Sequence, residues 1–190
     1  MINISVFASG SGTNFQALTD YFLERKNICI NLLLCNRPGA AVLDRASKAN
    51  IKSFVFTRHE LENSSKVLNF LVDHNTHFIV LAGFLLKIPD NILRVFPDRI
   101  INIHPALLPK YGGKGMYGMR VHEKVISSGD SFSGITIHMV NEEYDKGNII
   151  SQHTCEIKQD DTPATLAERI HQLEYYWYPR IIEKLLVSDR

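Results

Sequence analysis

Short hydrophobic runs alternate with amphipathic stretches through the first half of the chain. The runs are almost entirely apolar, as expected of strands that are covered on both faces of a sheet. They predict five strands, over residues 2–8, 28–35, 51–56, 78–82 and 99–103. Apolar residues at helical spacing predict helices from near Asn14, from about Ala40, over residues 60–75 and after Pro89. This alternation favours parallel pairing and right-handed crossovers, so the predicted fold class is α/β with a doubly wound, mostly parallel sheet.

The pattern changes after residue 104. Residues 105–118 form a long loop that contains Gly and Pro, and such loops in compact domains are often functional. A short helix is expected over Val121–Ser128, followed by two strands, 134–140 and 149–157, which are close enough in sequence to form an antiparallel edge. A long C-terminal helix begins near Thr162, with an apolar face made of Leu166, Ile170, Leu173, Trp177, Ile181 and Leu185. Since no repeat or linker interrupts the chain, we expect a single domain over residues 1–190.

Composition narrows the possible partners. The formal net charge is +1 over 190 residues, which gives no electrostatic argument for nucleic acid. The three cysteines, Cys29, Cys35 and Cys155, contain no C-x-x-C pair, and this usage favours a reducing compartment. The N-terminus lacks the features of a signal peptide, and no apolar stretch has the length of a membrane span. We expect a cytoplasmic protein, monomeric or homodimeric, that binds neither nucleic acid nor membrane.

Two polar side chains, Asn102 and His104, lie at the end of the fifth predicted strand. Residues two apart in a strand point to the same face, so the amide and the imidazole should lie side by side while Ile101 and Ile103 pack on the other face. An amide can donate a hydrogen bond to a developing oxyanion, and an imidazole can move a proton near neutral pH. The pair is a candidate catalytic site, although a core strand with a capping Asn and a hydrogen-bonded His explains the same residues.

A glycine-rich turn, Gly10-Ser11-Gly12-Thr13-Asn14, lies between the first strand and the first helix. Backbone N–H groups at a helix start lack intrahelical partners and carry a positive dipole, so the turn predicts a phosphate cradle. A dinucleotide fingerprint would need glycine where Phe15 stands, and the Walker pattern is absent. Arg37 leaves an NADP site open, and a tight turn with a capped helix is also open.

Asp145 lies in the turn after the strand that contains His138. A carboxylate near an imidazole raises its pKa and fixes its orientation, so Asn102, His104 and Asp145 together would make a proton-transfer and oxyanion site without a metal. A solvated turn aspartate is the simpler explanation of Asp145 alone. His104, His122, His138 and Asp145 could also be metal ligands, but none has the close spacing of a zinc motif.

Taken together, the chain resembles the folate-dependent formyltransferases, and the GSGTN turn is similar to that of the glycinamide ribonucleotide enzymes within this family. The matching segments occur in family order and are Ser9–Asn14, Val80–Phe84, Asn102–Tyr111, Gly134–His138 and Tyr144–Gly147. The N-x-H-P-x-L-L-P segment is specific to the family. The resemblance implies a Rossmann-like formyltransferase fold. It also implies transfer of the formyl group of 10-formyltetrahydrofolate, the co-substrate, to the primary amine of 5'-phosphoribosylglycinamide in purine biosynthesis.

The resemblance also implies roles for individual residues. His104 would move the proton, Asn102 would donate to the oxyanion of a tetrahedral intermediate, and Asp145 would raise the His104 pKa and order water. The implied binding residues are Gly12, Thr13 and Asn14 for the substrate phosphate, Glu174 for the ribonucleotide, and Leu85, Leu86, Lys87, Ile88 and Asn102 for the folate. No metal is implied. Without a binding role, Glu174 would be an ordinary surface residue of the helix, and residues 85–88 would simply pack in the core.

The chain departs from the family pattern at the folate tail. A family Arg aligns with Glu60, and Arg58 or Lys66 could replace it. The Gly112–Gly118 loop is longer than the commonest form, and His122 aligns with a family His to which we assign no role. Two other functions stay open: a folate-dependent formyltransferase with a sugar-nucleotide acceptor on the same scaffold, and a non-catalytic nucleotide-binding module.

Overall fold

The computed structural model of the protein describes residues 1–188, which contain seven strands and seven helices. The strands are β1 (Ile2–Ala8), β2 (Ile28–Cys35), β3 (Lys52–Val55), β4 (Phe78–Leu81), β5 (Ile100–His104), β6 (Phe132–Met139) and β7 (Ile149–Glu156). The helices are α1 (Thr13–Phe22), α2 (Ala41–Lys48), α3 (Arg58–Glu62), α4 (Lys66–Asp73), α5 (Asp90–Val95), α6 (Met119–Ser128) and α7 (Pro163–Ser188). The strand order is β3-β2-β1-β4-β5-β6-β7, and the predicted fold class is confirmed.

The chain divides into two compact units, Met1–Ile101 and a second that begins at Asn102. β5 therefore begins in the first unit, and its last three residues, which include Asn102 and His104, belong to the second. The expectation of a single domain over the whole chain stays a prediction.

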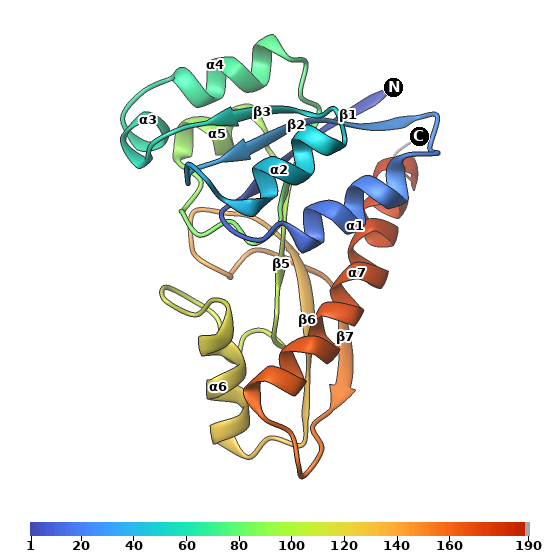
Figure 1. Cartoon of the computed structure of the whole chain (residues 1–190). Coiled ribbons are helices and arrows are strands. Elements are labelled where there is room, and N and C mark those ends of the chain that lie inside the picture. Colours follow the sequence, from blue (N-terminus) through green and yellow to red (C-terminus); the bar gives the residue numbers. More distant parts are fainter. Residues whose placement is uncertain (189–190) are drawn as a thin grey trace. The chain divides into compact units, whose positions relative to one another are not determined.

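The first unit is a parallel sheet built around β1. β1 pairs with β2 and with β4, and β3 pairs with β2. β1, β2 and β4 are buried along most of their length, which explains why they read as continuous apolar runs. α1 and α2 contact each other on one face of the sheet and α4 covers the other (Figure 1), as right-handed crossovers require.

The helix predicted over residues 60–75 is two helices, α3 and α4. Thr57 begins α3 with a capping box, in which its side chain accepts from the Glu60 N–H and Glu60 in turn accepts from the Thr57 N–H. The Ser64 hydroxyl then donates to the Glu60 carbonyl and accepts from the Lys66 N–H. These side-chain bonds compete with the helical backbone pattern and end α3 early.

The second unit contains the antiparallel pair β6–β7. Exposed positions recur along β7, as expected of an edge strand with one face in solvent. α7 packs on β6 and β7 and against α6 (Figure 1). None of the helices in residues 1–188 is long and apolar enough to cross a membrane.

The buried row of α7 differs from the predicted one. Residues four apart are fully buried: Leu166, Ile170, Glu174, Tyr178 and Ile182. Leu173, Trp177, Ile181 and Leu185 are only half-buried, and Trp177 stacks on His153 of β7 with ring centroids 3.8 Å apart. The predicted face thus includes Leu166 and Ile170 of the buried row, but the row continues through Glu174, which a pattern of apolar residues does not include.

His122, on α6, is a buried histidine with an exposed fraction of 2%. Its Nδ1 has no hydrogen-bond partner within residues 1–188. Burial, with smaller contributions from His171 and His104, lowers the pKa of His122 from 6.5 to about 4. The folded state therefore holds this side chain neutral at a pH where the unfolded chain protonates it.

We predict that His122 makes the protein sensitive to acid. Because its pKa is lower in the folded state, its contribution to stability is present above pH 6.5 and is lost as the pH falls towards 4. Between pH 7.5 and pH 4.5, wild type should lose about 2 kcal/mol more unfolding free energy than His122→Leu. Urea unfolding at both pH values measures this, with exposed His77→Leu as the control. Equal losses in wild type and His122→Leu would show that His122 is not the acid-sensitive group.

Candidate active site

The second unit brings Asn102 of β5 next to His138 of β6. The amide nitrogen Nδ2 of Asn102 lies 3.1 Å from Nε2 of His138, and Nδ1 of His138 lies 2.8 Å from the Met139 carbonyl oxygen. A carbonyl only accepts, so the hydrogen of neutral His138 is on Nδ1 and Nε2 accepts from the amide. The neighbouring strand thus fixes which way the Asn102 side chain points.

Asp145 lies between two imidazoles in the loop after β6. Its carboxylate oxygens are 3.6 Å from Nδ1 of His104 and 3.7 Å from Nε2 of His138. Both distances exceed a direct hydrogen bond, but the backbone N–H of Gly113 donates to Oδ2 at 2.8 Å. The side chains of His104 and Asp145 are 4% and 12% exposed. The structure therefore places Asn102, His104 and Asp145 around one buried centre, together with His138.

The other ring nitrogen of His104 contacts the backbone. Nε2 lies 2.7 Å from the Tyr111 carbonyl oxygen, so Nε2 carries a hydrogen and donates it. In the neutral ring, Nδ1 then has a lone pair that faces Asp145. This is the nitrogen that can accept a proton beside a carboxylate.

The electrostatics of the site keep His104 neutral and Asp145 ionised. Burial lowers the pKa of His104 below its ordinary value and outweighs Asp145 and the Tyr111 carbonyl, which both raise it. Burial would raise the pKa of Asp145, but the favourable interaction with His138 and His104 when these rings are protonated, together with the Gly113 N–H, outweighs it, so this pKa is lowered. Asp145 thus acts on His104 in the expected direction, but burial makes the net shift of the His104 pKa downward.

The glycine-rich turn lies in the first unit, at the start of α1. Gly12 is the N-cap residue of α1, with φ +74°. As a glycine, it has no side chain that could cap the helix. A Cβ at Gly12 would come within 2.9 Å of the Val42 backbone and closer to its side chain. The turn therefore requires glycine here, and the backbone N–H groups at the start of α1 point out of the helix end, as they do at any helix N-terminus.

Two contacts that the sequence did not predict lie at and beside this turn. Arg45 of α2 donates from Nε to the Ser11 carbonyl at 2.8 Å. Ser9 donates to Asn36 Oδ1 at 2.6 Å and accepts from the Leu85 N–H at 3.1 Å. Ser9 thus connects the end of β1 to the segment that follows β4. Neither contact has a sequence signal, because each joins a side chain to a segment far along the chain.

Comparison with known proteins identifies the family. A family model described as formyl transferase matches residues 2–182. The chain belongs to the formyl transferase family. The predicted family is therefore confirmed, and the match runs through both units.

The relatives of this formyl transferase carry a more specific name. The phosphoribosylglycinamide formyltransferase of Bacillus subtilis (strain 168) is 38% identical over 98% of this chain and 95% of that protein. The chloroplastic protein of the same name from Arabidopsis thaliana is 38% identical over 94% of this chain, which spans 63% of that protein's length.

Solved structures agree with this likeness. The phosphoribosylglycinamide formyltransferase of Bacillus halodurans has a TM-score of 0.89 and 31% identity, over 99% of this chain and 97% of that one. The glycinamide ribonucleotide transformylase 1 of Geobacillus kaustophilus has a TM-score of 0.87 and 37% identity, over 98% of this chain and 99% of that one.

The predicted folate segment of this formyl transferase lies after β4, in the first unit. Leu85 and Leu86 are half-buried, Lys87 is exposed and Ile88 is buried. Ile88 thus packs in the core, while the other three retain exposed surface. Their role in folate binding stays a prediction.

The residues at the predicted folate tail are paired with each other. Arg58 forms an ion pair with Glu62 at 2.7 Å, and Lys66 pairs with Glu60. Glu60, where the family has Arg, closes the capping box of α3. A glutamate at this position therefore has a local structural role.

Glu174 is not a surface residue. It lies on α7 with an exposed fraction of 5%, and its charge, after burial, raises the pKa of the buried Tyr178. Its role in binding the ribonucleotide stays a prediction.

Among residues 1–188, no three or more His, Cys, Asp or Glu side chains are grouped so as to hold a metal ion.

We predict that Asp145→Asn lowers the pKa of His104 further. The carboxylate favours the protonated imidazole, so a neutral amide of the same shape removes that support. The C2–H proton shift of His104, followed by NMR against pH, measures the pKa, with exposed Asp160→Asn as the control. An unchanged or raised His104 pKa in Asp145→Asn would contradict the role given to Asp145.

Proposed function

We propose that this protein transfers the formyl group of 10-formyltetrahydrofolate to the primary amine of 5'-phosphoribosylglycinamide in purine biosynthesis. Its relatives from Bacillus subtilis and Arabidopsis thaliana are named phosphoribosylglycinamide formyltransferases, and the family generally uses a formyl folate as co-substrate. The observation that carries the proposal is the grouping of half-buried Asn102 and Asp145 with buried His104 in the second unit.

The reaction needs an oxyanion donor and a proton carrier. The amine nitrogen attacks the formyl carbon, whose carbonyl oxygen becomes an oxyanion in the tetrahedral intermediate. Asn102 has two amide hydrogens, and the one that does not point to His138 donates to this oxyanion. Donors fixed before the reaction stabilise such a charge by several kcal/mol, of order 3.

His104 moves the proton. The attacking amine loses a proton and the departing folate nitrogen gains one when the carbon–nitrogen bond breaks. Nδ1 of His104 accepts the proton and returns it, while Nε2 stays bound to the Tyr111 carbonyl. Asp145, 3.6 Å from Nδ1, stabilises the imidazolium and orders the water through which the proton passes.

The binding roles follow the same proposal. Gly12, Thr13 and Asn14 hold the substrate phosphate through the first N–H groups of α1, with Arg45 supporting the turn. Glu174 binds the ribonucleotide, and residues 85–88 with Asn102 bind the folate. We further propose that both units act as one catalytic domain, in the cytoplasm, as a monomer or homodimer.

We predict that wild type transfers the formyl group and that His104→Ala is slower by about 10²- to 10⁴-fold, the range of general acid–base catalysis. Release of tetrahydrofolate from 10-formyltetrahydrofolate, followed by absorbance with the ribonucleotide as acceptor, measures the rate. His77→Ala, at an exposed position directly before β4, is the control. Ribonucleotide binding without transfer would favour a binding module, and transfer only to sugar nucleotides would favour the other acceptor.

We predict that Gly12→Ala raises KM for the ribonucleotide by about tenfold or more, the cost of losing one hydrogen bond to a charged group. The substitution forces the turn away from Val42 and moves the N–H groups that hold the phosphate. Gly39→Ala has a similar positive φ but open space around it, so it controls for backbone strain. An unchanged KM in Gly12→Ala would remove the cradle from the binding site.

A further inference from the structure

One short segment, Tyr111-Gly112-Gly113, contacts both titrating partners of the site. The Tyr111 carbonyl accepts from Nε2 of His104 at 2.7 Å, and the Gly113 N–H donates to Asp145 at 2.8 Å. A Cβ on Gly112 would lie 3.2 Å from Cβ of Asp145. The position of this segment therefore sets the surroundings of His104 and Asp145 together.

The backbone of Tyr111 is in an unfavourable conformation. Its φ is +57°, in the left-handed region that residues with a Cβ avoid. Gly112 follows directly and would tolerate this conformation better. An outlier of this kind persists only where its surroundings enforce it, so something must hold Tyr111 in place.

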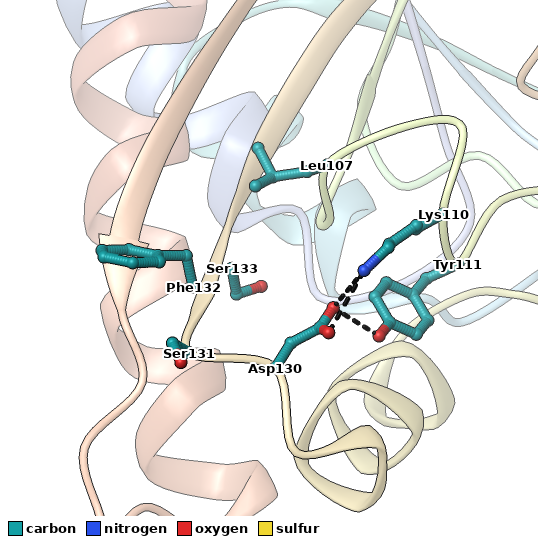
Figure 2. A pocket seen from close by; sticks show the side chains of 7 residues that line it. All are labelled: Leu107, Lys110, Tyr111, Asp130, Ser131, Phe132 and Ser133. Atoms are coloured by element: carbon teal, nitrogen blue, oxygen red, sulfur yellow. Dashed lines mark hydrogen bonds and ion pairs between the residues drawn. The ribbon is translucent and has the colours of Figure 1, made fainter.

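The side chain of Tyr111 provides that anchor. Its hydroxyl lies 2.7 Å from Asp130 Oδ2 and 2.7 Å from Ser128 Oγ. Asp130 can only accept, so the phenol donates to the carboxylate, the stronger acceptor. Lys110 donates to both carboxylate oxygens at 3.0 and 3.1 Å. Figure 2 shows Lys110 and Tyr111 converging on Asp130 from the loop after β5.

A cavity lies beside Lys110, Tyr111 and Asp130. The cavity has a volume of about 310 Å³, and its lining includes Phe132 and Ser133 as well as Lys110, Tyr111 and Asp130 (Figure 2). Part of the Tyr111 side chain therefore faces this cavity. The contacts of its hydroxyl with Asp130 and Ser128 are the polar interactions that hold the phenol in place.

We propose that Tyr111 is a positioning residue: Asp130 holds its phenol, and its carbonyl thereby holds the His104 imidazole with Nδ1 towards Asp145. For its catalytic consequence this inference rests on the proposed formyl transfer. The geometric claim concerns the tautomer of His104 and does not need activity. Since Tyr111 directly precedes the Gly112–Gly118 loop, its contacts with Asp130 and His104 fix the start of this loop next to the site.

The groups that face His104 come from several elements. Asp145 in the loop after β6 and the Tyr111 carbonyl raise its pKa, while burial and His138 of β6 lower it. His122 of α6 is also close enough to interact. Loss of the carbonyl contact therefore lowers the pKa of His104 and releases its Nε2 hydrogen to exchange between the two ring nitrogens.

Long-range ¹H–¹⁵N NMR of the full chain reads the tautomer of His104 directly. We expect the Nε2–H form in wild type and a mixture of tautomers, with a lower titration midpoint, in Tyr111→Phe and in Asp130→Ala, which removes the acceptor of the phenol. Tyr117→Phe, a half-exposed tyrosine of the same loop, should match wild type. A wild-type tautomer and midpoint in Tyr111→Phe would overturn the proposal.

Steady-state kinetics of the same variants separate this inference from the proposed function. If wild type transfers the formyl group, Tyr111→Phe should lower kcat by about five- to tenfold with little change in KM, and its pH profile should move to lower pH. If wild type transfers nothing while the tautomer still shifts in Tyr111→Phe, the positioning claim holds and the proposed function fails. A lower kcat with an unchanged tautomer and pH profile would show a merely structural role and overturn the proposal.

Discussion

The site depends on one buried carboxylate, Asp145, held between the imidazoles of His104 and His138. Burial opposes charge on both His104 and Asp145, because it raises the pKa of a carboxyl group and lowers the pKa of an imidazole. Asp145 stays ionised because the Gly113 N–H donates to it and because a proton on either imidazole would favour its charged form. A neutral imidazole next to a fixed negative charge is then ready to accept a proton, which formyl transfer to an amine requires.

The fold supports this arrangement with few elements. β5 places Asn102 and His104 on one face by simple alternation, and β6 adds His138, which orients the Asn102 amide. The carboxylate and the carbonyl come from two loop residues with positive φ, Asp145 at +56° and Tyr111 at +57°. These two of the positive-φ residues lie at the site, where the Asp145 side chain and the Tyr111 carbonyl face His104.

The sequence predicted those parts of the site that follow from local periodicity. Alternation in β5 paired Asn102 with His104, and family segments pointed to Asp145, which tolerates a left-handed turn. Contacts made by the backbone, such as the Tyr111 carbonyl and the Gly113 N–H, have no residue-type signal and could not be read in advance. His138 ended one of the family segments and was otherwise considered only as a metal ligand, because its hydrogen bond to Asn102 depends on the register of two strands.

The fold, like the site, was predicted only where a pattern of residue types marks it. Continuous apolar runs predicted the parallel strands, since burial on both faces leaves a clear pattern. The break between α3 and α4 depends on hydroxyl groups that bond to the backbone, and the buried row of α7 includes Glu174. Hydrophobic periodicity detects neither feature, because polar side chains make both of them.

The central claim is that His104 is a neutral, buried base whose proton uptake limits activity in acid. The pH dependence of kcat/KM for 5'-phosphoribosylglycinamide in wild type tests it most directly, because that profile reports groups of the free enzyme. The account predicts an acid limb with an apparent pKa below the ordinary histidine value of 6.5. An acid limb above 6.5, or a profile without one, would contradict the account.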